Sequence, residues 1–375
     1  MKILIFASWY PNKKDSIAGI FVREQAKALH KDNIDVRVFF PFDKSQKNSN
    51  CVKCEEDGLI TYRCNTDYIK NSKISRVNSI IKSIRELNKI KKEYDFDIIH
   101  CHVCYPSGII GYFYKKFYGT KYIITEHMSY IESYAKKKYN YMLFKKAFMS
   151  AEVVVCVSNY LCNNLNKLGF EFKSAIIGNV VDTCSFKDIK SDYFKNDCIN
   201  ILFIGSMDRD EVKGVPFLIK AFSKLVHLNK DVRLHLIGDG IKRDEYEELS
   251  VKLGIENYCT FYGKLDKLYI TKILQACSFF VLPSKYETFG VVIIEALACG
   301  KPVLTTDTGA QKEIISNEKL GYIVKSEDVD SLFLGLKYMT DNYINYDSKY
   351  LRDYALNYSY ENIAKKLHNL YNTII

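Results

Sequence analysis

The sequence lacks the features of a membrane-spanning, secreted or low-complexity protein. No apolar run approaches the roughly 20 residues of a transmembrane helix, and no internal repeat or biased tract occurs apart from a polar loop at residues 43–57. Residues 3–10 are apolar, but one lysine precedes them and Pro11 and Asn12 follow without a small-residue cleavage site. We interpret this segment as a first strand rather than a signal peptide. We therefore expect a globular protein in the cytoplasm.

The composition is typical of a folded enzyme of ordinary size. Hydrophobic residues make up 47% of the 375 residues and charged residues 26%, which indicates a globular rather than a disordered chain. A chain of this length is too long for one typical core, so we expect two domains of about 180 residues each.

Twelve cysteines are scattered among segments that resemble buried strands and loops, which points to free thiols in a reducing compartment. Two pairs, Cys51 with Cys54 and Cys101 with Cys104, have the spacing of zinc ligands. Because the stretch between the pairs is long, free thiols are the favoured interpretation and a four-thiolate zinc site is the alternative.

Positive charge is concentrated in the first half of the chain. Residues 1–178 contain 29 Lys and Arg against 17 Asp and Glu, whereas residues 179–375 contain 25 against 27. Basic and aromatic residues interleave there in a manner that favours an anionic membrane surface. A helix with a solvated lysine face is the alternative, and nucleic acid is disfavoured because no nucleic-acid-binding module is present. The basic residues are Lys82, Arg85, Lys89, Lys91, Lys92, Lys115, Lys116, Lys136, Lys137, Lys138, Lys145 and Lys146.

Near-continuous apolar strands alternate with segments of helical periodicity along the whole chain. This pattern predicts an α/β fold with two doubly wound units, each a parallel sheet covered on both faces. A polar linker is expected at residues 182–200, and ligand sites are expected at the carboxyl ends of the strands. The expected strands are residues 2–7, 35–40, 59–63, 97–102, 121–125, 152–156, 175–177, 200–205, 232–237, 259–262, 279–282, 302–306 and 321–324.

The segment at residues 283–313 says most about function. Glu287 and Glu295 are separated by seven residues, with Phe289 and Gly290 just after the first acid and an apolar helix former leading through the second. A helix that begins near Gly290 would present free N–H groups to an anion such as a phosphate. Glu295 would lie roughly 7 to 8 Å along the axis with its carboxylate leaning back towards that anion. A ribose diol lies about that far from its diphosphate.

Each of these residues also has a purely structural interpretation. Glu295 alone would more often be a solvated residue on a helix whose other face packs in the core. His100, His102 and His127 follow predicted strands, and a lone histidine in such a place is usually a structural hydrogen-bonding residue.

The segment resembles the signature of the retaining glycosyltransferases of family 4, which have the two-domain GT-B fold. The resemblance implies that Glu287 contacts the donor sugar, that the amides of Phe289, Gly290 and Val291 hold sugar and diphosphate, and that Glu295 binds the ribose. It extends over residues 200–325, and further matching positions are Gly205, Lys213, Gly214, Leu236–Gly240, Phe261–Leu265, Gly309 and Glu313.

The first half resembles the same family more loosely. Gly19 matches its N-terminal glycine loop, residues 97–102 match a strand end on the acceptor side, and His127 matches a position near the donor sugar. One departure concerns the diphosphate, because Ser206 stands where the family often has arginine. Arg209 or Lys213 must then neutralise the leaving group.

The resemblance implies an acceptor-binding domain at residues 1–180, a nucleotide-sugar-binding domain at 181–358, and a final helix at about 359–375 packed on the first. We expect a hexosyltransferase that moves a sugar, from a UDP-sugar rather than GDP-mannose, to a lipid-linked or saccharide acceptor. Capsule or lipopolysaccharide synthesis at the inner face of the cytoplasmic membrane is the expected setting. Glu287, His127 and Lys213 are the expected catalytic residues. No metal or cofactor is expected, because Lys213 and the helix terminus at Gly290 supply positive charge.

Two other classes of protein stay open on the sequence alone. One is an epimerase or hydrolase that uses a nucleotide sugar on the same fold, and a product assay with donor alone would reveal it. The other is a non-catalytic binding protein, which any turnover would exclude.

Overall fold

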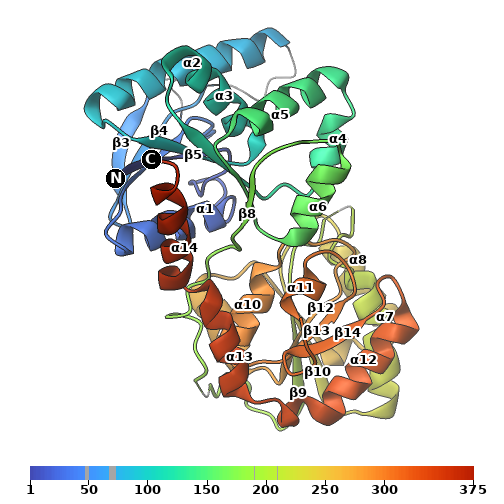
Figure 1. Cartoon of the computed structure of the whole chain (residues 1–375). Coiled ribbons are helices and arrows are strands. Elements are labelled where there is room, and N and C mark those ends of the chain that lie inside the picture. The colour runs from blue at the N-terminus through green and yellow to red at the C-terminus, as the bar shows by residue number, and fades with distance from the viewer. Residues whose placement is uncertain (47–49, 67–72, 190, 209) are drawn as a thin grey trace. The chain divides into compact units, whose positions relative to one another are not determined.

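Continuous apolar segments form the strands of two separate sheets. The computed structural model describes every residue except 47–49, 67–72, 190 and 209. It divides into unit 1, which comprises Met1–Val180 and Tyr360–Ile375, and unit 2, which comprises Val181–Ser359. Each unit contains one sheet flanked by helices (Figure 1). The predicted α/β class with two Rossmann-like parallel-sheet domains is therefore confirmed.

The sheet of unit 1 has eight strands in the order β3-β4-β2-β1-β5-β6-β7-β8. All neighbours are parallel except β3 and β4, which form an antiparallel edge pair. Strands β5 and β6 are buried along their whole length, which is why they consist largely of apolar residues. The strands are β1 (Lys2–Ala7), β2 (Asp35–Phe40), β3 (Val52–Glu56), β4 (Leu59–Arg63), β5 (Ile98–His102), β6 (Tyr122–Glu126), β7 (Val154–Cys156) and β8 (Ser174–Ile176).

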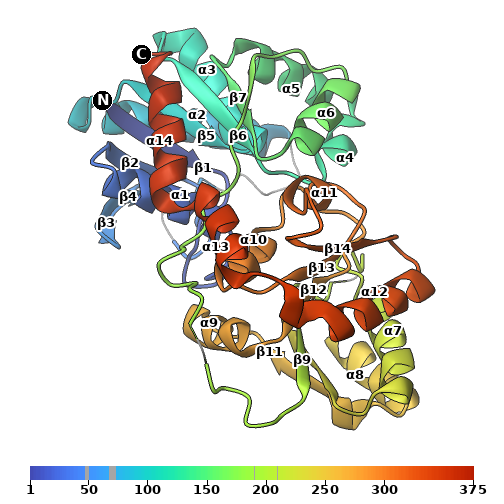
Figure 2. The same cartoon turned by 60° about the horizontal axis from the view of Figure 1, so that its bottom comes forward.

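Helices cover both faces of this sheet (Figure 2). The first helix and the last helix of the chain, α1 and α14, lie against each other on one face, and α2, α3 and α5 pack together on the other. The helix expected at the end of the chain thus belongs to unit 1. The helices are α1 (Ile20–Lys31), α2 (Lys73–Glu93), α3 (Ile109–Tyr118), α4 (Ile131–Ala135), α5 (Lys138–Ser150), α6 (Asn159–Lys167) and α14 (Tyr360–Asn372).

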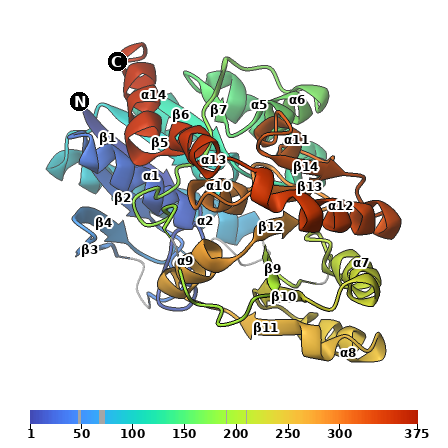
Figure 3. The same cartoon turned by 90° about the horizontal axis from the view of Figure 1, so that it is seen from below.

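The sheet of unit 2 has six strands, all parallel, in the order β11-β10-β9-β12-β13-β14 (Figure 3). Its strands are β9 (Ile199–Ile204), β10 (Val232–Ile237), β11 (Cys259–Gly263), β12 (Phe279–Leu282), β13 (Val303–Thr306) and β14 (Gly321–Val324). Its helices are α7 (Val215–Leu228), α8 (Arg243–Lys252), α9 (Lys267–Ala276), α10 (Val291–Ala298), α11 (Gln311–Ile314), α12 (Val329–Asn342) and α13 (Ser348–Ala355). Helix α7 packs against α12, and α10 packs against α13.

One prediction about the fold was wrong. The polar loop expected at residues 43–57 contains strand β3, which pairs with β4 at the edge of the sheet. Val52, at the start of β3, is exposed. Because an edge strand has one free side and polar residues on it, its sequence lacks the apolar signal of the buried strands.

Candidate active site

Three loops of unit 2 meet around Glu287 at the carboxyl ends of β9, β12 and β13. The Lys285 N–H donates to the carbonyl oxygen of Val212 at 2.7 Å, which joins the loop after β12 to the loop after β9. The Ala310 N–H donates to the carbonyl oxygen of Glu287 at 3.1 Å, which adds the loop after β13. The loop that carries Glu287 is therefore held at two points, at Lys285 and at Glu287 itself.

Two glycines make this convergence possible. At Gly214, with φ 69°, a Cβ atom would lie 2.0 Å from the carbonyl oxygen of Pro283. At Gly309, with φ 57°, a Cβ atom would lie 2.2 Å from the carbonyl oxygen of Glu287. Both positions combine a left-handed backbone with a close backbone approach, so only glycine fits.

An ion pair joins two of the predicted catalytic residues. Lys213 Nζ lies 2.6 Å from Glu287 Oε2, and the side chains are 25% and 12% exposed. The stem of Lys213 runs beside Gly205, where a Cβ atom would lie 3.2 Å from Lys213 Cγ. The structure therefore brings Gly205, Lys213 and Glu287 together, and in the unliganded chain Glu287 balances the charge of Lys213.

Helix α10 begins where the sequence predicted. Gly290 is its N-cap with φ 87°, and the first hydrogen bond of the helix is donated by Ile293 N–H to the Gly290 carbonyl oxygen at 3.0 Å. The amides before it, starting at Val291, precede the hydrogen bonds of the helix and can bind an anion. The ring of Phe289 is 3% exposed and packs on Tyr358 with ring centroids 5.4 Å apart. Phe289 can thus offer a ligand its backbone amide but not its ring. Glu295 is half-buried, one turn and a half into the helix.

Residue Arg209, the second candidate for the diphosphate, lies outside the described residues, so its role stays a prediction. Asp208 and Asp210 flank it and form an Asp-x-Asp pattern, and paired carboxylates can hold Mg²⁺ on a phosphate. This pattern runs against the expectation of a metal-free site. In the described part of the chain, no group of three or more His, Cys, Asp or Glu residues is arranged to hold a metal ion.

Three histidines in unit 1 stack at the ends of β5 and β6. His102 Nδ1 lies 3.1 Å from His127 Nε2, and the His100 and His102 ring centroids are 4.5 Å apart. His100 has partners on both nitrogens, Tyr371 Oη at 2.7 Å and Thr125 Oγ1 at 2.6 Å. These contacts fit the structural interpretation of His100. His102 Nε2 is buried and has no hydrogen-bond partner among the described residues. The side chain of Asn179 hydrogen-bonds His127 and opposes the fall of its pKa.

Burial keeps these rings uncharged. It lowers the pKa of His100 to about 3, and burial together with the nearby His100 lowers the pKa of His127 to about 3. The pKa of His102 is also well below its usual value because the ring is buried. At neutral pH His127 is therefore a neutral imidazole with one N–H donor and one acceptor nitrogen, not an imidazolium that acts as a general acid.

Glu126 organises the same loops and was not assigned a role from the sequence. Its buried carboxylate accepts the N–H groups of Cys104, His127 and Met128 at 2.8–2.9 Å. Burial raises the pKa of Glu126 to about 7, although the three hydrogen bonds oppose the rise. The only signal in the sequence was an acid directly after an apolar strand.

We expect the stability of the protein to fall as the pH is lowered from about 6.5 towards 4. The unfolded chain protonates its histidines near 6.5, whereas His100 and His127 have pKa values of about 3 in the fold. The unfolded state then binds more protons, at about 1 kcal/mol per pH unit for each histidine. Glu126 opposes this between about pH 7 and 4.5, but it is one group against the histidines with a lowered pKa, His100, His102, His127 and His235. Thermal unfolding of His100→Gln should depend less on pH, and the exposed-histidine control His30→Gln should match the wild type. Equal slopes in all three proteins would contradict the assignment.

Gly19 lies against the loop that follows β1 in unit 1. It is the N-cap of α1 with φ 67°, and a Cβ atom there would lie 2.3 Å from the backbone carbonyl of Trp9. The next turn carries Phe21, whose ring lies 4.3 Å from that of His127. Gly19 and His127 therefore belong to the same end of the sheet.

Part of the basic surface predicted from the sequence lies on and between helices α4 and α5. Lys89, Lys91 and Lys115 pair with acids, and Phe144 and Phe148 are in the core. Lys82, Arg85, Lys92 and Lys116 make no ion pair among the described residues. The cluster that we call the α4–α5 surface is a group in which such unpaired lysines lie among exposed tyrosines. It consists of Tyr130, Tyr134, Lys136, Lys137, Lys138, Tyr139, Lys145 and Lys146. None of the helices that the structure describes is long and apolar enough to cross a membrane.

All twelve cysteines are free. Cys51 Sγ lies 2.7 Å from Cys64 Sγ across the β3–β4 pair. Burial raises the pKa of Cys101 and Cys104 well above the usual thiol value. Zinc requires thiolates, so this pair does not favour the zinc alternative.

Comparison with known proteins gives a consistent result for both units. The family model "Glycosyltransferase Family 4" matches residues 18–184, and "Glycosyl transferases group 1" matches residues 186–357. An uncharacterized glycosyltransferase of Methanocaldococcus jannaschii is 27% identical over 88% of this chain and 86% of its own. An N-acetylgalactosaminyltransferase of Campylobacter jejuni, named for a diphospho-undecaprenol acceptor, is 32% identical over 44% of this chain and 40% of its own.

Solved structures share the fold at low identity. Sucrose-phosphate synthase from Thermosynechococcus elongatus has a TM-score of 0.84 and 21% identity, with 100% of this chain and 99% of that chain covered. Anabaena HepE in complex with UDP-glucose has a TM-score of 0.77 and 16% identity, with 100% of both chains covered.

Proposed function

The chain belongs to the family 4 glycosyltransferases, and from that premise we propose that it transfers a hexose or amino sugar, with retention, from a UDP-sugar to a lipid-linked or saccharide acceptor. The observation that carries the proposal is the convergence of Lys213, Glu287 and the Gly290 helix terminus in unit 2. UDP-sugars are the first donors to test, since the structurally similar HepE holds UDP-glucose.

We assign each residue of the unit 2 site a role that follows from its chemistry. Lys213 and the first amides of α10 stabilise the charge on the departing diphosphate. Glu287 accepts hydrogen bonds from the sugar, and Glu295 accepts them from the ribose. We propose that His127, a neutral imidazole, hydrogen-bonds the sugar. An acceptor hydroxyl then attacks the anomeric carbon, the bond to the diphosphate oxygen breaks, and the diphosphate takes the proton.

A membrane-associated acceptor fits the α4–α5 surface. Exposed tyrosines and unpaired lysines suit the headgroup region of anionic lipid. We therefore place the enzyme at the inner face of the cytoplasmic membrane, in the synthesis of a cell-surface polysaccharide such as capsule or lipopolysaccharide.

A thermal-shift screen of nucleotides and nucleotide sugars tests the proposed function. A ligand at 100 times its dissociation constant should stabilise the protein by about 2.7 kcal/mol. The stabilising donor is then incubated with and without candidate acceptors. Transfer only with an acceptor supports the proposal, donor breakdown or epimerisation alone supports a different enzyme on this fold, and no stabilisation by any nucleotide sugar refutes it.

Activity should survive chelation. If Lys213 and the α10 terminus supply all the positive charge, EDTA should reduce the transfer rate by less than twofold. The acidic pair Asp208 and Asp210 provides the counter-hypothesis, so the assay includes Asp208→Asn, which should keep wild-type activity. Complete loss with EDTA that Mg²⁺ or Mn²⁺ restores would show that these acids hold a required metal.

Binding to anionic vesicles should depend on the α4–α5 surface and on salt. Each lysine near the surface contributes about 1 kcal/mol, so a variant with Lys136, Lys137 and Lys138 all changed to Gln should bind about 100-fold more weakly at low salt. The matched control changes three exposed lysines of unit 2, Lys220, Lys252 and Lys349. Co-sedimentation that is equal for neutral and anionic vesicles, or equal for both triple variants, would contradict the surface assignment.

A further inference from the structure

Unit 1 contains a cavity at the strand ends where the sequence predicts ligand sites, but its lining residues were not among the predicted ones. Its volume is about 500 Å³, within the range of small-molecule sites. It lies at the carboxyl ends of the strands, and its walls come from the loops after β1, β2, β5 and β6 and from the start of α2. Such a position at the end of a parallel sheet is where ligands bind in doubly wound folds.

The charge of the cavity is strongly positive. Lys14, Lys44 and Arg76 line it, and none of them makes an ion pair in the part of the chain that the structure describes. Among the described residues of the lining, Asp15 is the one carboxylate; it accepts the N–H groups of Ile17 and Ala18 at 3.1 Å and so shapes the loop. The lining therefore has an excess of two positive charges.

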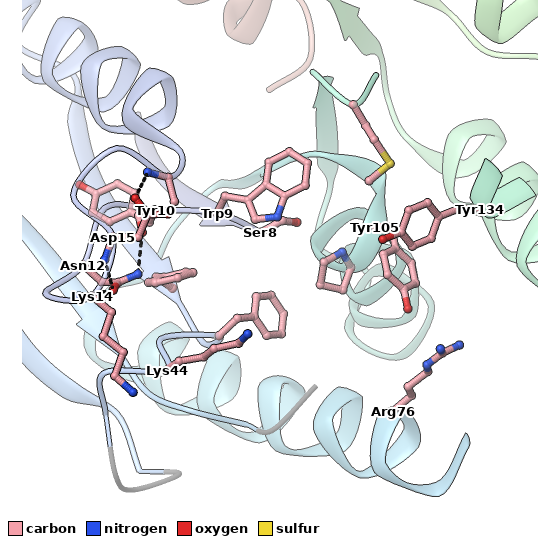
Figure 4. Close-up of a pocket in the computed structure, with 15 residues that line it drawn as sticks. Ser8, Trp9, Tyr10, Asn12, Lys14, Asp15, Lys44, Arg76, Tyr105 and Tyr134 are labelled. Atoms are coloured by element: carbon pink, nitrogen blue, oxygen red, sulfur yellow. Dashed lines mark hydrogen bonds between the residues drawn. The ribbon is translucent and has the colours of Figure 1, made fainter. Parts of the chain in front are cut away.

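Aromatic side chains complete the cavity (Figure 4). Trp9 and Tyr134 are exposed there, and Tyr134 packs on Tyr105 with ring centroids 5.2 Å apart. Their rings offer apolar surface to a sugar ring or an alkyl group, and the indole N–H and phenol groups offer hydrogen bonds. In Figure 4 the three cations lie along one side of the cavity, with Trp9 across from them and the two tyrosines at one end.

The side chain of Arg63 holds two of the loops that carry the lining residues, the loop after β1 and the loop after β2. Its guanidinium donates to Asp43 Oδ2 at 2.9 Å and to the carbonyl oxygen of Pro11 at 2.8 Å, and its side chain is 8% exposed. Asp43 precedes Lys44, and Pro11 lies between the Trp9 and Lys14 positions of the lining. A buried ion pair thus holds the basic loops at the cavity, so the cations do not sit on free coil.

We propose that this cavity binds a phosphate-bearing acceptor: a sugar whose phosphate or diphosphate ester is bound by cations of the row Lys14, Lys44 and Arg76, with Lys44 and Arg76 the residues to test, while the ring packs against Trp9 and the tyrosines. The inference rests on the proposed glycosyl transfer and specifies its acceptor. A phosphate monoester carries about −1.5 to −2 charges at pH 7, which matches the excess of two positive charges, whereas a carboxylate supplies only one. Arginine and lysine are also the side chains that bind phosphate most directly.

Calorimetry with the full-length protein tests the proposal in two steps. The first step titrates UDP, which reports on the unit 2 site alone. The second step, at saturating UDP, titrates the 1-phosphates of glucose, galactose, mannose and N-acetylglucosamine and the same four sugars without phosphate. We expect at least one sugar 1-phosphate to bind ten or more times as tightly as its unphosphorylated form.

The variants Arg76→Gln and Lys44→Gln should each weaken binding of that sugar phosphate by tenfold or more, because each loses a charge-assisted hydrogen bond. Neither should change the affinity for UDP. Arg85→Gln is the matched control, an exposed arginine on the same helix α2 that does not line the cavity. A decyl diphosphate ester of the same sugar separates the two sources of phosphate: tighter binding than the 1-phosphate assigns a lipid-linked acceptor, and equal or weaker binding assigns a free sugar phosphate.

Three results would overturn the proposal: equal affinity for phosphorylated and neutral sugars, unchanged affinity in both cavity variants, or no binding of any phosphorylated probe at millimolar concentration. Absence of UDP binding in the first step would instead count against the proposed function, so the two failures are distinguishable.

Discussion

Glu287→Gln should lower the turnover of the nucleotide sugar and at the same time raise the affinity for the free nucleotide diphosphate. The carboxylate of Glu287 lies 2.6 Å from the ammonium of Lys213, so in the unliganded protein it competes with the diphosphate for that charge. A partly exposed ion pair contributes up to about 1 kcal/mol, which corresponds to a gain of about two- to fivefold in nucleotide affinity. The sequence alone predicts only that this affinity stays nearly unchanged.

The loss of turnover has a separate cause. Hydrogen bonds from sugar hydroxyls to an ionised carboxylate are worth roughly 1.5 to 3 kcal/mol, so kcat/KM should fall about 10- to 100-fold. Lys213→Gln should have the opposite effect on nucleotide affinity. It should weaken binding of the nucleotide diphosphate about tenfold. Lys220→Gln, an exposed lysine on the following helix, is the control. Calorimetry with the nucleotide alone would contradict this pairing if Glu287→Gln bound it more weakly than the wild type.

The fold was predictable because buried parallel strands are almost continuously apolar. Strands such as β1 and β5 show this apolar character within five or six residues. The segments between the strands have helical periodicity instead. Strand β3 was missed because it lies at an edge, where Val52 is exposed and polar residues dominate. Its pairing depends on the neighbouring β4 rather than on its own composition.

The candidate site of unit 2 was predictable in its residues but not in its contacts. The resemblance to the family motifs identified Lys213, Glu287 and Gly290 as site residues. The structure brings these three residues together. The ion pair between Lys213 and Glu287 joins residues 74 positions apart, and no local pattern encodes that distance. The ring of Phe289 is in the core, which leaves only its amide for a ligand.

The position of the unit 1 cavity at the strand ends was predictable, but its lining residues were not, for the same reason. Its cations, Lys14, Lys44 and Arg76, come from separate loops and a helix start, and each one alone is an ordinary surface residue. Glu126 was partly hidden for the same reason, because Cys104, one of its three backbone partners, becomes its neighbour only when β5 and β6 pair. Residues that are distant in the sequence and meet only in the fold can be assigned to a site only when the order of the strands is known.

Glu295→Gln should weaken both the free nucleotide diphosphate and the full donor by about tenfold or more. Glu295 is the fifth residue of α10, so it lies about 7 Å along the axis from the anion site at the helix start. That distance suits the ribose diol when the diphosphate occupies the α10 terminus. Loss of the carboxylate charge removes two charge-assisted hydrogen bonds, each worth roughly 1.5 to 3 kcal/mol, and leaves weaker neutral ones.

A comparison of UDP with 2′-deoxy-UDP makes the assignment specific. The wild type should bind UDP about tenfold more tightly than the deoxy form, because only UDP presents both hydroxyls to Glu295. In Glu295→Gln this preference should largely disappear, since the carboxylate that reads the diol is gone. Glu248→Gln, an exposed helical glutamate of α8 in the same unit, should keep both the affinity and the preference of the wild type. If Glu295→Gln kept them too, Glu295 would be a solvated residue on a helix face, and the spacing between the two glutamates would carry no nucleotide-binding meaning in this chain.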